Sequence, residues 1–319
     1  MIYNVKIRFI IALQVLAFPA ALSQSLLDQS AFFAGGTADA QKIFQAYAGP
    51  WASMYGHSLN NGWVNTAKTH KPFGFDLTIT NTVAIAPRSE KTFDIAELGL
   101  NQLGKSNGST TVAQTTVGNN NKKNDRPSLD LLSPYGTYSN VLSIPKGSGF
   151  PATILPAIQI GMGLMKETEI SIRYSPPINY GRYGTINHWG IAMKHNLRQY
   201  LPAARLLPFD ISVMAAISQL NNKTDVTNDP QQYLFDPGIT FDKTDRSIKM
   251  GVTAWNTILS ASTSLPFFNI IGSIGYSGIM ARMKATGTYP IPSGETDFFR
   301  EAGQRGAQSG FAHGGGGVA

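Results

Sequence analysis

Residues 209–218, with the sequence FDISVMAAIS, decide how this chain folds. Apolar side chains occupy every second position, beginning with Phe209, Ile211 and Val213, and the positions between them hold Asp210 and mostly small or hydroxyl-bearing residues. Successive side chains of a β-strand point to opposite faces. The stretch therefore predicts a strand with one apolar face and one polar face. The polar face differs from that of a water-exposed strand, which is usually rich in Lys and Glu.

The same alternation recurs along the chain. We expect antiparallel strands at 62–68, 73–86, 90–98, 150–163, 168–180, 186–196, 208–220, 247–264 and 267–286. Two of these are much longer than the usual strand of about 5–6 residues. Segments of about 10 residues with one apolar and one polar face are typical of transmembrane β-barrels. Strands of a soluble sandwich or barrel also alternate, so a soluble periplasmic β-protein is the alternative.

The lengths of the connections favour the membrane interpretation. Long polar loops are expected at 99–149 and 221–246, and the predicted strand order places both on one side, as in outer-membrane barrels. The strands then span 62–287. The tail, 288–319, shows no alternation, so we expect it to be irregular and the barrel to be C-terminally incomplete or frame-shifted near residue 293.

The N-terminus predicts export and a plug. Residues 1–23 combine Lys6 and Arg8 with an apolar run and small residues at its end, which is the pattern of a cleaved signal peptide. In the following segment, 24–61, an aromatic stripe at helical spacing predicts a helix from Asp39 to His57, kinked or split at Gly49-Pro50. We expect this helix either to pack on a core or to form a plug inside the barrel. The fold class is thus all-β: an antiparallel transmembrane β-barrel of outer-membrane type with an N-terminal helical plug.

Composition excludes several classes of function. Charged residues make up 14%, the net charge is +7, and no Cys is present, so thiol catalysis and Cys-ligated metals are excluded. The basic residues form no stripe with aromatics, so we expect no nucleic-acid binding. Residues 99–106, GLNQLGKS, match a phosphate-binding loop, but no helix pattern follows and we interpret them as a loop. We expect no metal, no cofactor and no enzymatic activity.

One block resembles a known family. Asn61, Gly62, Trp63 and Ala67, followed by a Gly-Phe-Asp-Leu-Thr run at 74–78, resemble an uncharacterised domain-of-unknown-function family of outer-membrane β-barrels from diderm bacteria. The resemblance covers roughly residues 30–287. The sequence is also loosely similar to the long-chain fatty-acid channels of the outer membrane. It implies a barrel with an N-terminal hatch and a location in the cell outer membrane.

These observations predict a passive channel for small hydrophobic molecules. We expect an apolar gate formed by Phe44, Tyr47, Trp51 and Tyr55, and lumen charges that set polarity or pin the plug: Asp76, Glu169, Arg173, Asp210 and Lys249. The alternatives are a structural or docking barrel of a surface-secretion or adhesion machinery, and a lipid-modifying barrel enzyme. Expected partners are outer-membrane lipid and lipopolysaccharide.

Overall fold

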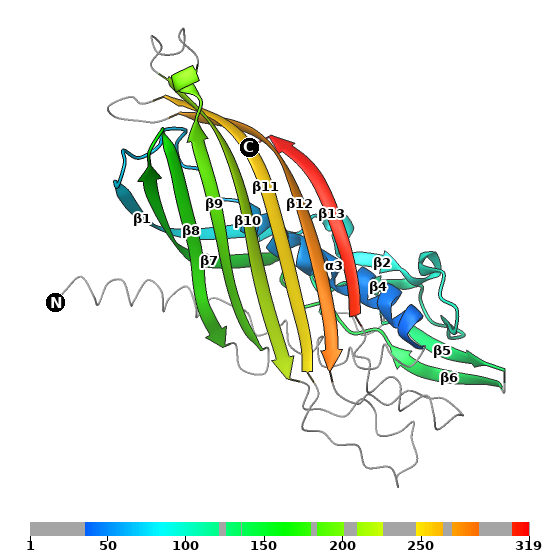
Figure 1. Ribbon diagram of the computed structural model, residues 1–319. Helices are drawn as coiled ribbons and strands as arrows, with labels where there is room; N and C mark the ends of the chain where they lie inside the picture. Colours follow the sequence, from blue (N-terminus) through cyan, green and yellow to red (C-terminus); the bar gives the residue numbers. More distant parts are fainter. Residues whose placement is uncertain are drawn as a thin grey trace.

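One antiparallel sheet dominates the computed structural model, which describes residues 36–120, 126–134, 136–179, 184–200, 209–225, 247–263, 270–286 and 308–318. For Thr37, Asp225, Ala285 and 308–318, only the backbone is described. The sheet curls into a half-barrel (Figure 1). Its strands, in spatial order, are β1 (Phe75–Ile85), β7 (Ala152–Leu164), β8 (Thr168–Asn179), β9 (Thr185–Asn196), β10 (Phe209–Asp225), β11 (Ser247–Thr263), β12 (Ile271–Thr286) and β13 (Gln308–Val318). The β-rich, antiparallel prediction is confirmed. The sheet ends at β1 and β13, which do not pair with each other in the described residues.

A single long helix, α3 (Gly36–Asn60), crosses the concave face of this sheet (Figure 1). It contacts β1, β7 and β10–β13. Its apolar side chains join those of Ile248, Met250 and Val252 on β11 in one buried cluster. The helix continues through Pro50, so the predicted split at Gly49-Pro50 is wrong.

The segment between β1 and β7 is more ordered than the loop that the sequence predicts for 99–149. It holds two small sheets, which pair β2 (Thr92–Asp94) with β4 (Val112–Gln114) and arrange β3 (Leu103–Lys105), β5 (Ser128–Ser133) and β6 (Gly136–Ser143) side by side. Leu103, Leu129 and Leu142 share the buried cluster of α3. The hydrophobic effect therefore folds this segment over the helix.

Three strand assignments made from the sequence are wrong. Residues 62–68 form no strand, and 90–98 contribute only β2 between the 3₁₀ helices η3 (Arg88–Glu90) and η4 (Ile95–Leu98). In the tail predicted to be irregular, Gln308–Val318 forms β13 and pairs antiparallel with β12. A further 3₁₀ helix, η6 (Arg198–Tyr200), follows β9. The signal peptide and residues 24–35 lie outside the described residues.

The two faces of the main sheet have opposite polarity. On the convex face, β1 exposes Phe75, Leu77 and Ile79 at 76%, 64% and 60%. The same face carries exposed apolar residues on β7–β12, among them Ile160, Ile172, Met193, Ile217, Trp255 and Ile274. On the concave face, polar residues such as Arg173, Ser212 and Asn256 are buried. No helix in the described part of the chain is long and apolar enough to cross a bilayer.

Candidate functional site

The C-terminal end of α3 is held by side chains of the main sheet. Helix termini leave carbonyl groups without intrahelical partners. Here the Leu59 carbonyl accepts hydrogen bonds from the indole Nε1 of Trp63 at 2.9 Å and from Arg173 at 3.4 Å. The Asn60 carbonyl accepts one from the amide of Asn256 on β11 at 2.7 Å. Gly62, at φ 74°, turns the chain away from the helix in the left-handed conformation that favours glycine.

Arg173 is the centre of this helix-end contact. Its guanidinium donates to the Asn61 carbonyl at 2.9 Å and, through two nitrogens, to the Gln159 amide oxygen at 3.2 and 2.9 Å. It also lies over the ring of Trp63, 4.0 Å from the centroid. The side chain is 2% exposed. A cation suits this position because the carbonyl end of a helix carries partial negative charge.

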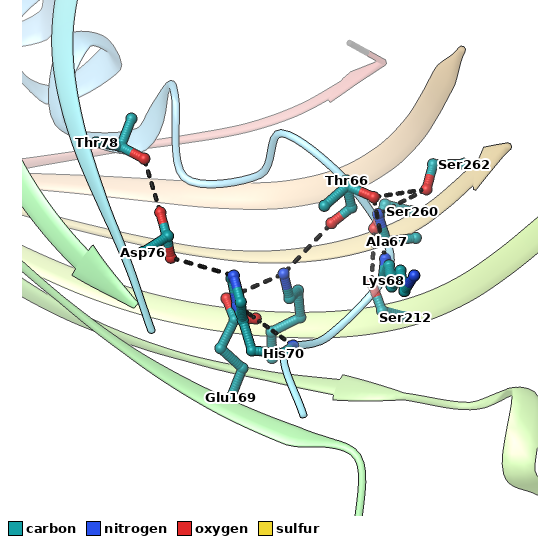
Figure 2. A network of polar contacts seen from close by, with 11 residues as sticks. Thr66, Ala67, Lys68, His70, Asp76, Thr78, Glu169, Ser212, Ser260 and Ser262 are labelled. Atoms are coloured by element: carbon teal, nitrogen blue, oxygen red, sulfur yellow. Dashed lines mark hydrogen bonds and ion pairs between the residues drawn. The ribbon is translucent and has the colours of Figure 1, made fainter. Parts of the chain in front are cut away.

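A second group, the interior polar cluster, consists of His70, Asp76, Glu169 and Lys194 (Figure 2 labels the first three). The carboxylate of Glu169 lies 3.0 Å from Nζ of Lys194 and 2.7 Å from Nδ1 of His70, and it accepts the His70 backbone N–H at 3.1 Å. Nε2 of His70 lies 3.7 Å from Asp76. Glu169 and Lys194 are buried, and burying either charge without its partner would be costly.

Hydroxyl groups tie the segment after α3 to the sheet. Ser262 on β11 accepts the Ala67 backbone N–H at 2.8 Å and contacts the Thr66 hydroxyl at 3.1 Å. The hydroxyls of Ser212 and Ser260 lie 2.9 Å apart beside them (Figure 2). These side-chain bonds satisfy the backbone of 66–68 in place of a strand partner, which explains why this segment is not the predicted strand.

A cavity of about 600 Å³ opens beside the cluster, at the end of the sheet where the short β7–β8 turn lies. Its lining combines the apolar parts of these side chains with polar groups and charges of both signs: Lys68, Thr69, His70, Lys71, Pro72, Glu167, Asn196, Arg198, Gln199 and Asp210. Arg198 lies 3.6 Å from Asp210, which accepts a hydrogen bond from Asn196 at 3.1 Å. Such a mixed lining suits small amphipathic molecules.

The predicted gate residues form a buried stripe on α3. Phe44, Tyr47, Trp51 and Tyr55 are each at most 5% exposed, and the rings of Trp51 and Tyr55 lie 4.4 Å apart. The Tyr47 hydroxyl donates to the Lys146 carbonyl at 2.9 Å, which joins the helix to the segment that covers it. Whether this stripe acts as a gate stays a prediction.

The predicted lumen charges divide between the two faces. Asp76, Glu169, Arg173 and Asp210 lie on the concave face, and Arg173 contacts the end of the helix. Lys249 does not: it is exposed on the convex face, because the apolar residues that alternate with it on β11 face α3. The four residues that carry the family resemblance all make structural contacts. Asn61 and Trp63 contact Arg173, Gly62 forms the turn after α3, and the Ala67 backbone N–H donates to Ser262.

A family model for a family of unknown function, DUF6588, matches residues 4–315. The chain belongs to this family. A search of curated proteins and a search of solved structures each found no match. The family assignment confirms the uncharacterised-family part of the resemblance and assigns no activity.

Sequence reasoning missed several residues of the site in this DUF6588 chain. Lys194 and Gln159 alternate with apolar neighbours on β9 and β7, a signal that marks the interior face but does not identify a partner. His70 lies in the segment after α3 and reaches Glu169 only through the fold.

His188 is a further interior residue of β9. It is 1% exposed, and neither ring nitrogen has a partner among the described residues. His195 lies on the opposite face of the same strand, as its spacing predicts, and contacts the Thr168 hydroxyl at 2.9 Å. The described residues contain no group of three or more His, Cys, Asp or Glu that could hold a metal ion.

Proposed function

We propose that the chain is an outer-membrane β-barrel protein in which α3 is a plug, and that movement of the plug admits small molecules. The observation that carries the proposal is the opposite polarity of the two sheet faces: the convex face exposes a band of large apolar side chains, while the concave face buries charges and hydroxyls. A bilayer favours this arrangement and water opposes it.

The strand dimensions agree with this proposal. β1 has 11 residues, the length with which a tilted strand crosses the hydrocarbon core of a bilayer. The exposed aromatic pair Trp255 and Tyr276, with ring centroids 5.6 Å apart, lies within the convex band.

The helix also bears on how the barrel closes. A closed barrel of eight strands has room only for side chains, whereas a helix with its side chains is about 10 Å wide. The main sheet, with α3 in its concavity, is therefore too open for closure through β1 and β13 alone. In a membrane the outer edges of β1 and β13, which have no partner strand among the described residues, require further pairing, because backbone groups facing lipid must be hydrogen-bonded.

The contacts of α3 support a closed resting state as part of this proposal. Its C-terminal carbonyls are bound by Arg173 and Asn256, and Ser58 contacts Thr153 of β7 at 3.1 Å. The cavity beside the interior polar cluster, with its mixed lining, supports small amphipathic solutes, whereas the sequence predicts hydrophobic ones. We propose that solute enters from the cavity once the anchor opens.

The chain lacks Cys, which allows a clean test of plug movement. We would replace Ser58 and Thr153 by Cys, because their side-chain oxygens are close enough for a disulfide to be tried there. Solute flux is then measured in proteoliposomes by swelling, with sugars, amino acids and short fatty acids. Oxidation of Ser58→Cys/Thr153→Cys should abolish flux and reduction should restore it.

The wild-type chain is the matched control, since oxidant cannot cross-link a protein without thiols. Equal flux in the oxidised and reduced double variant would contradict the plug mechanism. Absence of flux in every form, from a protein that inserts and shows a heat-dependent shift on gels, would instead support a non-transporting structural or docking barrel. That second function is favoured by the firm anchoring of α3 at its C-terminal end.

A further inference from the structure

The charged residues of the convex face are concentrated at one end of the sheet. In the part of the eight strands whose side chains the structure describes, the Lys, Arg, Asp and Glu residues on this face are all basic. They are Lys223 on β10, Lys249 on β11, and Arg282 and Lys284 on β12.

Three of these residues form a row across neighbouring strands. Lys223 pairs with Lys249 in the β10–β11 register, and Lys249 pairs with Lys284 in the β11–β12 register. Adjacent strands lie about 4.8 Å apart, so the three Cα positions span about 10 Å. Like charges placed directly opposite each other destabilise a sheet. A bound anion would relieve the repulsion within this row.

The position of the row relates it to the apolar band. Lys249 and Trp255 are six residues apart on the same strand face, which is about 20 Å at 3.3 Å per residue. Polar and small residues, including Asn221 and Thr253, lie between the lysine row and the large apolar side chains. The row thus stands beyond the edge of the band, where lipid head groups would lie. It is the end of the sheet that leads into 226–246, away from the short β7–β8 turn.

We propose that the lysine row binds the phosphate groups of the lipopolysaccharide head group in the outer leaflet. The acyl chains of the same lipid would cover the convex band around Ile217, Trp255 and Met280, which are 47%, 42% and 42% exposed. Ammonium groups suit phosphate because they are compact charges with several donors. Arg282, two residues from Lys284 on the same face, adds a planar donor that can bind phosphate through two nitrogens. This inference rests on the membrane placement proposed above.

The test measures binding of diphosphoryl lipid A to the full chain in neutral detergent micelles. Native mass spectrometry counts the bound lipid, and dephosphorylated lipid A and phosphatidylglycerol are compared under the same conditions. We expect tight binding of the diphosphoryl form that weakens as salt rises. Each lysine near a phosphate contributes about fivefold in affinity, so Lys223→Gln/Lys249→Gln/Lys284→Gln should lose about a hundredfold.

Two matched variants make the result specific. Lys166→Gln, in the short turn at the opposite end of the same sheet, should leave binding unchanged. Lys223→Arg/Lys249→Arg/Lys284→Arg keeps the charges and should keep the binding.

Several outcomes would overturn the proposal. These are unchanged binding in the triple Gln variant, equal binding of dephosphorylated lipid A, or equal binding of phosphatidylglycerol, which would assign a general anionic-lipid surface. Circular dichroism and the heat-dependent gel shift confirm that each variant is folded and inserted. If the protein folds and inserts but does not bind lipid A, only this inference is refuted. A chain that never inserts refutes the proposed function as well.

Discussion

The two faces of strand β8 show the two environments of the molecule side by side. On the convex face Ile172 and Tyr174 are 56% and 48% exposed, whereas on the concave face Ser171 and Arg173 are 6% and 2% exposed. Adjacent residues of one strand thus reverse the distribution that water imposes on a soluble protein. At β8 the interior is therefore held by hydrogen bonds and ion pairs, whereas the apolar side chains of the exterior stay exposed in the described part of the chain.

A charge placed within the apolar band should have the largest effect. If the convex face contacts lipid, Ile172→Lys should lower the free energy of unfolding by about 2–4 kcal/mol. If it contacts water, the change should stay within about 0.5 kcal/mol, as for other surface substitutions. Denaturant unfolding of the protein in lipid bilayers measures the difference.

The matched control for that variant is Asn221→Lys, on the same face near the lysine row. A charge near the membrane interface costs only about 0–1 kcal/mol. Equal effects at Ile172 and Asn221 would remove depth dependence, and with it the membrane interpretation of the convex face.

The next largest effect is expected on the concave face, at Arg173. Arg173→Met removes the hydrogen bonds to the Leu59 and Asn61 carbonyls and to Gln159, leaving buried acceptors without donors. We expect a loss of about 3 kcal/mol in unfolding free energy, because each unsatisfied buried group costs about 1–3 kcal/mol. Hydrogen exchange should rise first at the C-terminal turns of α3.

Arg173→Lys separates charge from geometry at this position. Lysine keeps the charge but cannot donate to Gln159 and to the helix end through a planar fork. We expect it to recover part of the stability and little of the protection of α3. Full recovery by lysine would mean that charge alone anchors the helix.

How far the sequence predicts this fold depends on what alternation can reveal. Strands β1, β7–β9, β11 and β12 were predicted to within four residues of their observed bounds because a two-residue period marks a strand. β10 continues to Asp225, five residues past its predicted end and into the predicted loop 221–246. The period does not tell which face is inside. On β11, Ile248, Met250 and Val252 face α3, so Lys249 was wrongly assigned to the interior.

Other parts of the fold were beyond pattern reasoning for different reasons. β13 is rich in glycine, which has no side chain to alternate, and its pairing with β12 decides its structure. In 90–98, the Asp94 carboxylate accepts the Ala96 N–H at 2.9 Å, and Gly99 ends η4 at φ 58°, so local capping replaces the strand. The site was only half predictable: Glu169 and Arg173 stood out as charges on alternating strands, but Lys194 and His70 become partners only through tertiary contacts.

A smaller effect is expected at Asp39, near the N-terminal end of α3. Its carboxylate accepts the backbone N–H groups of Asn101, Gln102 and Leu103 at 2.8–3.1 Å, and the side chain is fully buried. Asp39→Asn leaves one acceptor oxygen and places an amide against donors. We expect a loss of about 1–2 kcal/mol in unfolding free energy. The variant Asp94→Asn, at a half-buried helix cap, should cost less, and the reverse order would contradict the role assigned to Asp39.

The smallest effect concerns Asp130 on β5, outside the main sheet. The Ser106 hydroxyl and, second, the Asn140 backbone N–H at 2.8 Å donate to its carboxylate and lower the pKa of Asp130. A lowered pKa means that the charged form stabilises the folded state above the ordinary carboxyl range, and that this contribution is lost as pH falls through the lowered pKa. Asp130→Asn should therefore destabilise the protein only slightly at pH 7, because the carboxylate is largely solvated, and the deficit should shrink below about pH 4. Unfolding measured for both proteins across this range tests the sign, and a deficit that is independent of pH would contradict it. Ser106→Ala provides the control, since it removes the main cause and should raise the pKa of Asp130 toward its ordinary value.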